Sequence, residues 1–389
     1  MLKQLEAKEQ TKEKLEQLLT KEARSRALRD HHAYRAPRPC GMTVHPGFGC
    51  TNSCLYCYVA DMTAKKPSSE GAWPIVNRLS GTEMAYALAS NPHFLPGVMG
   101  TFVAMGAVCD PLHEKLVGKT LEYLEAFNRF LGSPTQLSTK MRVGSELAEE
   151  LAERSPRLSP LVTIITLKHA SKLEPRAPPP TERLETISSF RRAGLRPMLF
   201  LRPIIPGLTD GEVDEVLSAA RKAGAVGVVV GALRASEQII GRLRKAGVQT
   251  DEIERRLGRR RLGKGLVSVS SGDLKREALR LARRRGLIPF ASACCANAYT
   301  SGVPCTGLCW LRGFCTKCPN KCWTKLPKVD EEEVRQAVRR LLKLEPTSIQ
   351  ISKDEILIRL PRKVGKAEAR IARVVMEVSA RRLVRLQQP

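Results

Sequence analysis

The sequence is poor in aromatic residues, in long apolar runs and in acidic residues. Phe, Trp and Tyr make up only 5% of its 389 residues. The longest mainly apolar stretch, from Ala225 to Leu233, is far shorter than the ~20 residues that a membrane-spanning helix needs. The first thirty residues hold eight Lys or Arg, six Asp or Glu and no apolar signal segment. We therefore expect a cytoplasmic globular protein without membrane association, with 42% hydrophobic residues to build a large core.

The shortage of acid leaves a large positive charge. The chain has 65 Lys or Arg against 39 Asp or Glu, a net charge of +26. So many positive charges repel one another in the folded chain unless an anionic ligand lies among them. A nucleic acid is therefore the favoured partner. The segment from Arg234 to Arg285 alone has sixteen basic and six acidic residues. The alternative is a solvated helix face or an adaptation of the composition to heat.

From Met42 onward, short apolar runs alternate with helical periodicity, which predicts successive βα units around a parallel sheet. The six expected strands lie near Met42–His45, Thr101–Val108, Gln136–Thr139, Leu161–Leu167, Pro197–Arg202 and Val226–Gly231. Six units are too few to close an eight-fold barrel. The predicted fold class is therefore α/β, a partial (βα)6 TIM-like barrel with its active site at the C-terminal ends of the strands.

The rest of the chain is expected to surround this barrel as separate parts. The predicted divisions are an N-terminal helical arm (1–37), the barrel (38–250), a basic helical segment (251–290), a Cys-rich metal-binding segment (291–326) and a small α+β tail (327–389). The tail pattern predicts a helix, a hairpin, a second helix and a last strand.

Twelve cysteines in a chain with no export signal favour metal or redox chemistry over disulfides. Cys50, Cys54 and Cys57 follow the first predicted strand with C-x3-C-x2-C spacing. Three thiolates on one loop suit a [4Fe-4S] cluster that keeps one iron free for a small molecule. The alternative is a structural zinc site completed by Cys40 or His45.

The stretch Gly49–Tyr58 (GCTNSCLYCY) resembles the signature of the radical S-adenosylmethionine (SAM) enzymes, and within them the spore photoproduct lyase-like branch of DNA repair photolyases. The likeness continues through Ser138–Lys140, Leu173–Pro178 and Arg202–Asp210. This resemblance implies an enzyme with a partial barrel, a [4Fe-4S] cluster and SAM as cofactor. In such enzymes one electron from the cluster cleaves SAM to methionine and a 5′-deoxyadenosyl radical, which abstracts a hydrogen atom from the substrate.

The resemblance also implies roles for single residues that contact SAM. Tyr56 would lie against the adenine, Lys140 would pair with the carboxylate and Thr166 would reach the ribose. Ile205 and Gly207 would border the adenine. The alternatives are a solvated loop lysine for Lys140 and an ordinary strand residue for Thr166.

Cys109 ends the second predicted strand and is expected to face the active site. Photoproduct lyases use a cysteine near this strand end to return a hydrogen atom to the product radical. The resemblance therefore implies a catalytic role for Cys109, with a buried structural cysteine as the alternative.

A second group of seven cysteines lies within 29 residues near the C-terminus: Cys294, Cys295, Cys305, Cys309, Cys315, Cys318 and Cys322. Glycines and prolines separate them, so metal binding is expected to supply much of the segment's stability. We favour a second [4Fe-4S] cluster over zinc, because an enzyme of this kind is assembled where clusters are delivered. Seven thiols cannot complete two four-thiolate sites.

Three functions follow as hypotheses. The first is a radical SAM enzyme that acts on a nucleic acid, in lesion repair or base modification, with a one-electron donor such as a ferredoxin or flavodoxin. The second is a radical SAM enzyme that modifies a peptide or protein with the help of an auxiliary cluster. The third is a non-catalytic protein that binds zinc and nucleic acid. The aromatic side chains that could stack on a base, or more simply pack in the core, are Trp73, Trp310, Phe314 and Trp323.

Overall fold

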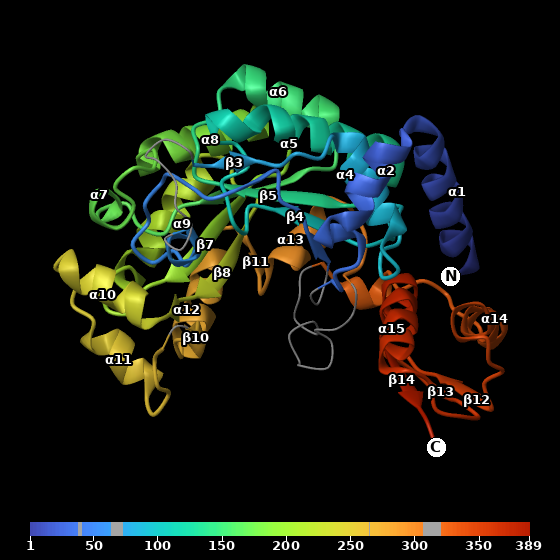
Figure 1. Ribbon diagram of the computed structural model, residues 1–389. Coiled ribbons are helices and arrows are strands. Elements are labelled where there is room, and N and C mark those ends of the chain that lie inside the picture. The colour runs from blue at the N-terminus through green and yellow to red at the C-terminus, as the bar shows by residue number, and fades with distance from the viewer. Residues whose placement is uncertain (38–40, 64–72, 264, 306–319) are drawn as a thin grey trace.

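A seven-stranded parallel sheet forms the centre of the computed structural model, which describes residues 1–37, 41–63, 73–263, 265–305 and 320–389 (Figure 1). In spatial order the strands are β1 (Met42–Thr43), β4 (Val103–Met105), β5 (Thr135–Thr139), β6 (Ser159–Thr163), β7 (Met198–Ile204), β8 (Gly227–Ala232) and β11 (Ile288–Phe290). Each pairs in parallel with its neighbours. All seven therefore end at one edge, as a partial TIM-like barrel requires.

The structure confirms the six predicted strands and adds β11, which the sequence pattern did not reveal. This strand has only three residues, and Pro289 at its centre cannot donate a hydrogen bond to the sheet. It pairs with β8 alone and so occupies an edge of the sheet, where a proline is tolerated.

Helices connect the strands and cover the outer side of the sheet (Figure 1). They are α4 (Gly81–Ser90), α5 (Glu114–Ala126), α6 (Ser145–Arg154), α8 (Pro180–Arg192), α9 (Val213–Lys222), α10 (Glu237–Lys245) and α12 (Gly272–Arg284). The apolar sides of these helices, α10 excepted, share one core with the outer side chains of the sheet, whereas α10 packs in a second apolar cluster with the cysteine-rich stretch around Tyr56. The start of α4 carries a capping box in which Ser80 and Glu83 satisfy each other's backbone N–H groups.

The arm forms two helices, α1 (Leu2–Leu18) and α2 (Lys21–Arg29), followed by the short turn η1 (His31–Ala33). Thr20 separates the two helices, and its hydroxyl accepts a hydrogen bond from the N–H of Ala23. Leu15 and Ala27 are fully buried in the barrel core, so the arm is part of the main body.

The tail has the expected order of elements and its own core. It comprises α14 (Glu331–Leu342), β12 (Ser348–Ile351), β13 (Glu355–Arg359), α15 (Lys366–Ala380) and β14 (Leu383–Gln387). Arg381 joins it to the barrel side, because its buried guanidinium donates to the carbonyls of Met99 (2.6 Å) and Gly100 (3.0 Å). None of the described helices combines the length and the hydropathy that crossing a bilayer would require.

Candidate active site

The cysteine loop (residues 49–58) lies beyond β1 and the two-residue strand β2 (Gly47–Phe48). Gly49 starts it with a φ of +94°, and a Cβ there would meet the Trp73 ring at 2.2 Å. Only glycine fits this position without displacing the ring. Trp73 also packs edge-on against Phe48, with ring centroids 5.6 Å apart. Its contacts therefore favour a packing role over base stacking.

Hydrogen bonds from distant parts of the barrel hold the cysteine loop. The N–H of Leu55 donates to the carbonyl of Leu173 at 2.9 Å. Arg242, on α10, donates to the carbonyls of Leu55 (3.0 Å) and Cys57 (2.8 Å) and also pairs with Asp61. These contacts fix the backbone of the loop before any cofactor binds.

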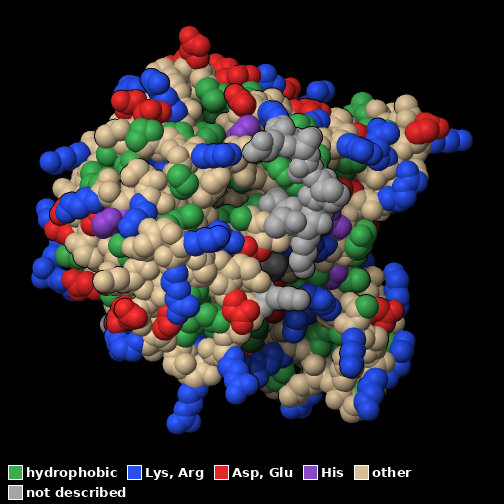
Figure 2. All heavy atoms as spheres, turned by 60° about the vertical axis from the view of Figure 1, so that its left-hand side comes forward, with side chains coloured by type: hydrophobic (Ala, Val, Ile, Leu, Met, Phe, Trp, Pro, Cys, Tyr) green, Lys and Arg blue, Asp and Glu red, His purple; other side chains and the backbone are tan. Residues whose placement is uncertain are grey.

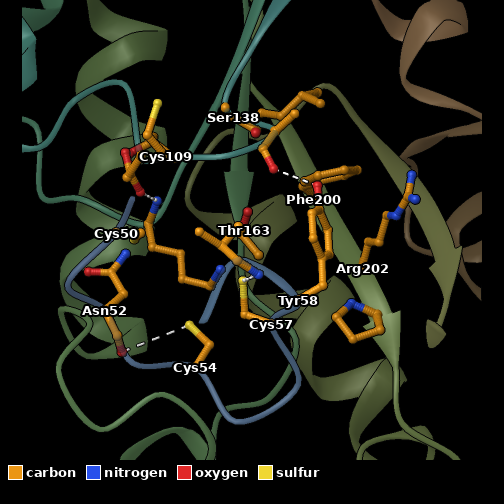
Figure 3. Close-up of a pocket in the computed structure, with 18 of the residues that line it drawn as sticks. Cys50, Asn52, Cys54, Cys57, Tyr58, Cys109, Ser138, Thr163, Phe200 and Arg202 are labelled. Atoms are coloured by element: carbon orange, nitrogen blue, oxygen red, sulfur yellow. Dashed lines mark hydrogen bonds between the residues drawn. The ribbon is translucent and has the colours of Figure 1, made fainter. Parts of the chain in front are cut away.

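The three loop cysteines line a cavity of about 440 Å³ (Figure 3). Tyr56, Lys140 and Cys109 line it too, so the structure brings together six of the residues that the sequence singled out. Figure 3 shows Cys54 and Cys57 in one part of the cavity and Cys109 in another. The cavity opens at the C-terminal strand ends, where a barrel enzyme places its site.

The spacing of the thiols fits a multi-iron cluster better than one zinc ion. The sulfur atoms of Cys50, Cys54 and Cys57 do not all lie within 4.8 Å of one another. The ligands of one tetrahedral zinc ion lie closer together than 4.8 Å, because each is only about 2.0–2.3 Å from the ion. Cys40, one candidate for a fourth ligand, lies outside the described residues, and His45 lies with two other histidines.

Burial controls the chemistry of these thiols. It raises the pKa of Cys50 to about 11, with a further rise from the Asp110 carboxylate. It also raises the pKa of Cys54 to about 12. Metal binding must therefore displace the protons, which couples cluster assembly to proton release.

A buried network lies beneath the loop around Glu174, which is itself fully buried. Glu174 accepts hydrogen bonds from the Tyr56 hydroxyl and the Arg183 guanidinium. The Lys140 ammonium lies 3.9 Å from the same carboxylate and 5.6 Å from the centroid of the Tyr56 ring. Two cations thus share one carboxylate, which leaves a net positive charge beside the thiols.

Charge interactions explain the state of Lys140 and Tyr56. Burial alone would lower the pKa of Lys140, but the charge of Cys54 in its ionised form and the Glu174 carboxylate raise it above its ordinary value. Lys140 is therefore a cation at neutral pH. Burial, followed by the Glu174 charge, raises the pKa of Tyr56 well above its ordinary value, so this side chain stays a neutral phenol.

Asp110 ties the end of β4 to the end of β5. Its carboxylate accepts from the Thr139 hydroxyl and from the N–H of Lys140, each at 2.7 Å. It also accepts from the N–H of Leu112 at 3.2 Å. Asp110 therefore positions the backbone that carries Lys140.

Three other predicted cofactor contacts lie elsewhere among the described residues. Thr166 is fully buried, does not line the cavity, and donates its hydroxyl to Glu212 at 2.6 Å. Ile205 is fully buried in the same apolar cluster as Cys54 and Tyr56 and does not line the cavity. Gly207 is exposed, with a φ of +76°, and the position of its absent Cβ lies 3.0 Å from the Cβ of Glu252.

The C-terminal cysteine group, defined here by its described members Cys294, Cys295, Cys305 and Cys322, lies beyond β11. The other three cysteines, Cys309, Cys315 and Cys318, and the aromatic residues Trp310 and Phe314 lie outside the described residues. The Cys305 thiol and burial raise the pKa of Cys322, and the N–H of Cys305 lies 3.5 Å from its sulfur.

This group lies close to the cavity. Cys294 and Cys295 belong to α13 (Ala293–Thr300), whose first residue lines the cavity. The described thiols therefore gather beside the candidate active site. Trp323, next to Cys322, is 38% exposed and contacts Lys353, with the ammonium 4.7 Å from its ring centroid.

Two arginines that the sequence did not single out also line the cavity, Arg202 and Arg234. Neither forms a salt bridge with a described residue. Gly231 makes room for the first, because a Cβ there would meet the Cγ and Cδ of Arg202 at 2.5 Å. Burial and the nearby Arg234 charge lower the pKa of Arg202, while Tyr58 opposes them.

Sequence reasoning also missed three positioning residues, Glu174, Asp110 and Arg242. Glu174 and Asp110 each precede a proline within a motif, and this position is the sequence signal that could have pointed to them. Arg242 lies in the charge-rich segment 234–285, and nothing local distinguishes it from its basic neighbours.

Comparisons with known proteins agree with this geometry. Residues 44–220 match the family model of the radical SAM superfamily. An uncharacterized protein of Acidianus two-tailed virus is 28% identical over 178 residues, which are 43% of this chain and 56% of the viral protein. An uncharacterized protein of Mycobacterium tuberculosis strain H37Rv is 28% identical over 205 residues, which are 50% of this chain and 59% of that protein. The matched segment thus spans less than two thirds of either relative.

The fold is similar to that of spore photoproduct lyase. A variant of that enzyme with bound AdoMet and dinucleoside spore photoproduct superposes with a TM-score of 0.53 at 15% identity, over 66% of this chain and 76% of that chain. The segment that matches the radical SAM family model, residues 44–220, includes the cysteine loop, Lys140 and the strands β4 to β7 of the sheet. Residues 44–220 of this chain are therefore similar to the radical SAM superfamily, and the fold of the chain is spore photoproduct lyase-like.

Proposed function

We propose that this radical SAM enzyme acts on a nucleic acid, in lesion repair or base modification. One observation carries the proposal: Arg202 and Arg234 line the cavity of the cysteine loop, and neither has a salt-bridge partner among the described residues. A pair of neighbouring guanidinium groups suits a phosphate backbone, which binds arginine in bidentate geometry. Spore photoproduct lyase, whose fold this chain shares, binds a dinucleoside spore photoproduct.

The proposal divides the cavity between cofactor and substrate. Cys50, Cys54 and Cys57 would hold the [4Fe-4S] cluster that the superfamily implies, and the excess positive charge around Lys140 would bind the SAM carboxylate. When bound, cluster and SAM supply the radical chemistry. Tyr56 and Glu174 keep Lys140 in place, and the buried walls exclude water from the reacting atoms.

A cavity of about 440 Å³, which would also hold the cofactor, cannot admit a duplex. The target base would have to leave its stack to enter, at a cost of a few kcal/mol. Single-stranded or damaged DNA pays the least for this step and is therefore the favoured substrate form.

The basic segment 234–285 contributes less to this proposal than its composition suggests. Ion pairs with nearby acids engage Arg244, Arg255, Arg256, Arg280 and Arg285. These arginines are partly neutralised within the fold. The face in Figure 2 still carries many more Lys and Arg side chains than acidic ones, in keeping with the net charge of +26.

The test uses the full chain, reconstituted anaerobically with iron and sulfide and supplied with SAM and dithionite. Formation of 5′-deoxyadenosine is measured alone and with single-stranded DNA, duplex DNA, RNA or a peptide pool. The proposal expects a nucleic acid to stimulate the reaction and to bind with a steep salt dependence. Stimulation by peptides alone would replace it with peptide modification.

A variant pair assigns the binding to the cavity arginines. The R202Q/R234Q double variant should reduce the slope of log K against log salt by about 2, since each phosphate contact contributes about 1. The matched control is Arg285→Gln, which removes an exposed arginine already paired with Asp214. An equal change in both variants would show that binding is diffuse and unrelated to the cavity.

A further inference from the structure

Three histidines from two separate segments meet outside the cavity. His31 and His32 lie in η1 at the end of the arm, and His45 follows β1. One ring nitrogen from each lies within 4.8 Å of the other two. The centroids of the His32 and His45 rings are 5.6 Å apart.

His32 is oriented like a metal ligand. Its side chain is 0% exposed, and its Nδ1 lies 2.6 Å from Oδ1 of Asp30. Its Nε2 is buried and has no hydrogen-bond partner among the described residues. A carboxylate on one imidazole nitrogen fixes the ring and leaves the other nitrogen to bind a metal, which is the usual support for metal-binding histidines.

His45 also has an unpaired ring nitrogen, because its Nδ1 is buried without a hydrogen-bond partner among the described residues. Leaving a buried polar atom unpaired costs about 1–3 kcal/mol. Two such atoms in one small cluster therefore call for a ligand between them. His31 is 43% exposed and closes the cluster toward solvent.

We propose that His31, His32 and His45 bind one divalent transition-metal ion, and that this ion is zinc. Three neutral imidazoles suit zinc, which binds histidine nitrogen at about 2.0–2.1 Å. Tetrahedral ligands at that distance lie about 3.3 Å apart, so the nitrogens would have to approach by at most about 1.5 Å. The exposed side of His31 leaves the fourth position to water.

The place of this site in the fold gives it a structural consequence. The carbonyl of His32 accepts from Asn91 at 2.7 Å, and that of His45 accepts from Asn77 at 3.0 Å, so both backbones are already fixed. An ion between them would fasten the N-terminal arm to the strand that leads into the cysteine loop. It would raise the unfolding midpoint of the whole chain by mass action.

The test must separate this site from cysteine-bound metal. Zinc and iron per chain are measured on the reconstituted, desalted protein and on His32→Asn and His45→Gln variants. The proposal expects each variant to lose one zinc ion per chain with its iron content unchanged. His93→Asn is the matched control, because His93 is also buried and its Nδ1 is also unpaired.

X-ray absorption at the zinc edge provides a readout on the unaltered protein, independent of whether the variants fold. Nitrogen scatterers at about 2.0–2.1 Å support the site, and their loss in the half-exposed His31→Asn variant assigns them. Only sulfur at about 2.3 Å, or a zinc content that no histidine variant changes, would overturn the proposal. In that case water fills the space between the rings.

Discussion

The cysteine loop and the C-terminal cysteine group hold their thiols in opposite ways. The loop is fixed through its backbone by Leu173 and Arg242, and its thiols face a cavity. In the C-terminal group, the sulfur of Cys322 accepts from Asn320 at 3.1 Å, and Cys305 and Cys322 are 2% and 4% exposed. A metal site that must admit a small molecule needs a ligand loop whose backbone is held by residues outside the site. Enclosed thiols instead suit a metal centre whose ligands all come from the protein.

The largest effect on SAM cleavage should come from replacing one cysteine by alanine in each group and comparing the two variants. Cys54→Ala should reduce formation of 5′-deoxyadenosine to background, because two thiolates no longer hold the cluster that binds SAM. Cys322→Ala should keep substrate-independent SAM cleavage while losing metal from the C-terminal group. Iron counts measure the metal lost in each variant, and far-UV circular dichroism shows whether the chain is still folded. Equal loss of cleavage in the two variants would remove the distinction between the groups.

Next in size is the buried ion pair beneath the loop. Arg183→Met leaves the Glu174 carboxylate buried with less compensation and should lower the free energy of unfolding by about 3–5 kcal/mol. Chemical denaturation of the apoprotein measures it. Arg192→Met, at an exposed position of the same helix α8, is the control. A change under about 1 kcal/mol would mean that Lys140 alone can neutralise Glu174.

A smaller effect should follow from loosening the loop. Arg242→Gln removes charged hydrogen bonds to the carbonyls of Leu55 and Cys57, worth about 1.5–3 kcal/mol each. The cluster should then lose iron to a chelator faster than in the parent enzyme. Arg244→Gln, on the same helix but paired with Glu254, should leave the rate unchanged. Matching rates for both variants would contradict the assignment of Arg242 as a positioning residue.

The smallest effect on SAM cleavage is expected from Cys109→Ala. Cys109 is 5% exposed, and burial raises its pKa to about 12, so it carries the S–H bond that a hydrogen-atom donor needs. The variant should cleave SAM normally but release a different distribution of products from the proposed nucleic-acid substrate. Chromatography of those products checks it. An unchanged distribution and unchanged turnover would leave Cys109 a packing residue.

Local patterns predicted the parts of the molecule that depend on neighbours in sequence. The spacing of Cys50, Cys54 and Cys57 and the position of Lys140 at a strand end placed them correctly in one cavity. Thr166 does not line this cavity with them. Its hydroxyl donates a hydrogen bond to Glu212, 46 residues later, and no local pattern reveals this contact.

Arg242 was missed for the same reason, since it contacts Cys57 across 185 residues of sequence. The edge strand β11 was hidden by its proline and its shortness. Distant pairings of this kind depend on tertiary packing, and the sequence pattern alone cannot assign them.

The most direct test of the account is the electron paramagnetic resonance spectrum of the dithionite-reduced, reconstituted enzyme, recorded before and after addition of SAM. If Cys50, Cys54 and Cys57 leave one iron open to SAM, the spectrum of a reduced [4Fe-4S] cluster must change when SAM is added, and this change must vanish in Cys54→Ala. A spectrum that SAM does not alter, or a protein that holds only zinc at these thiols, would contradict it.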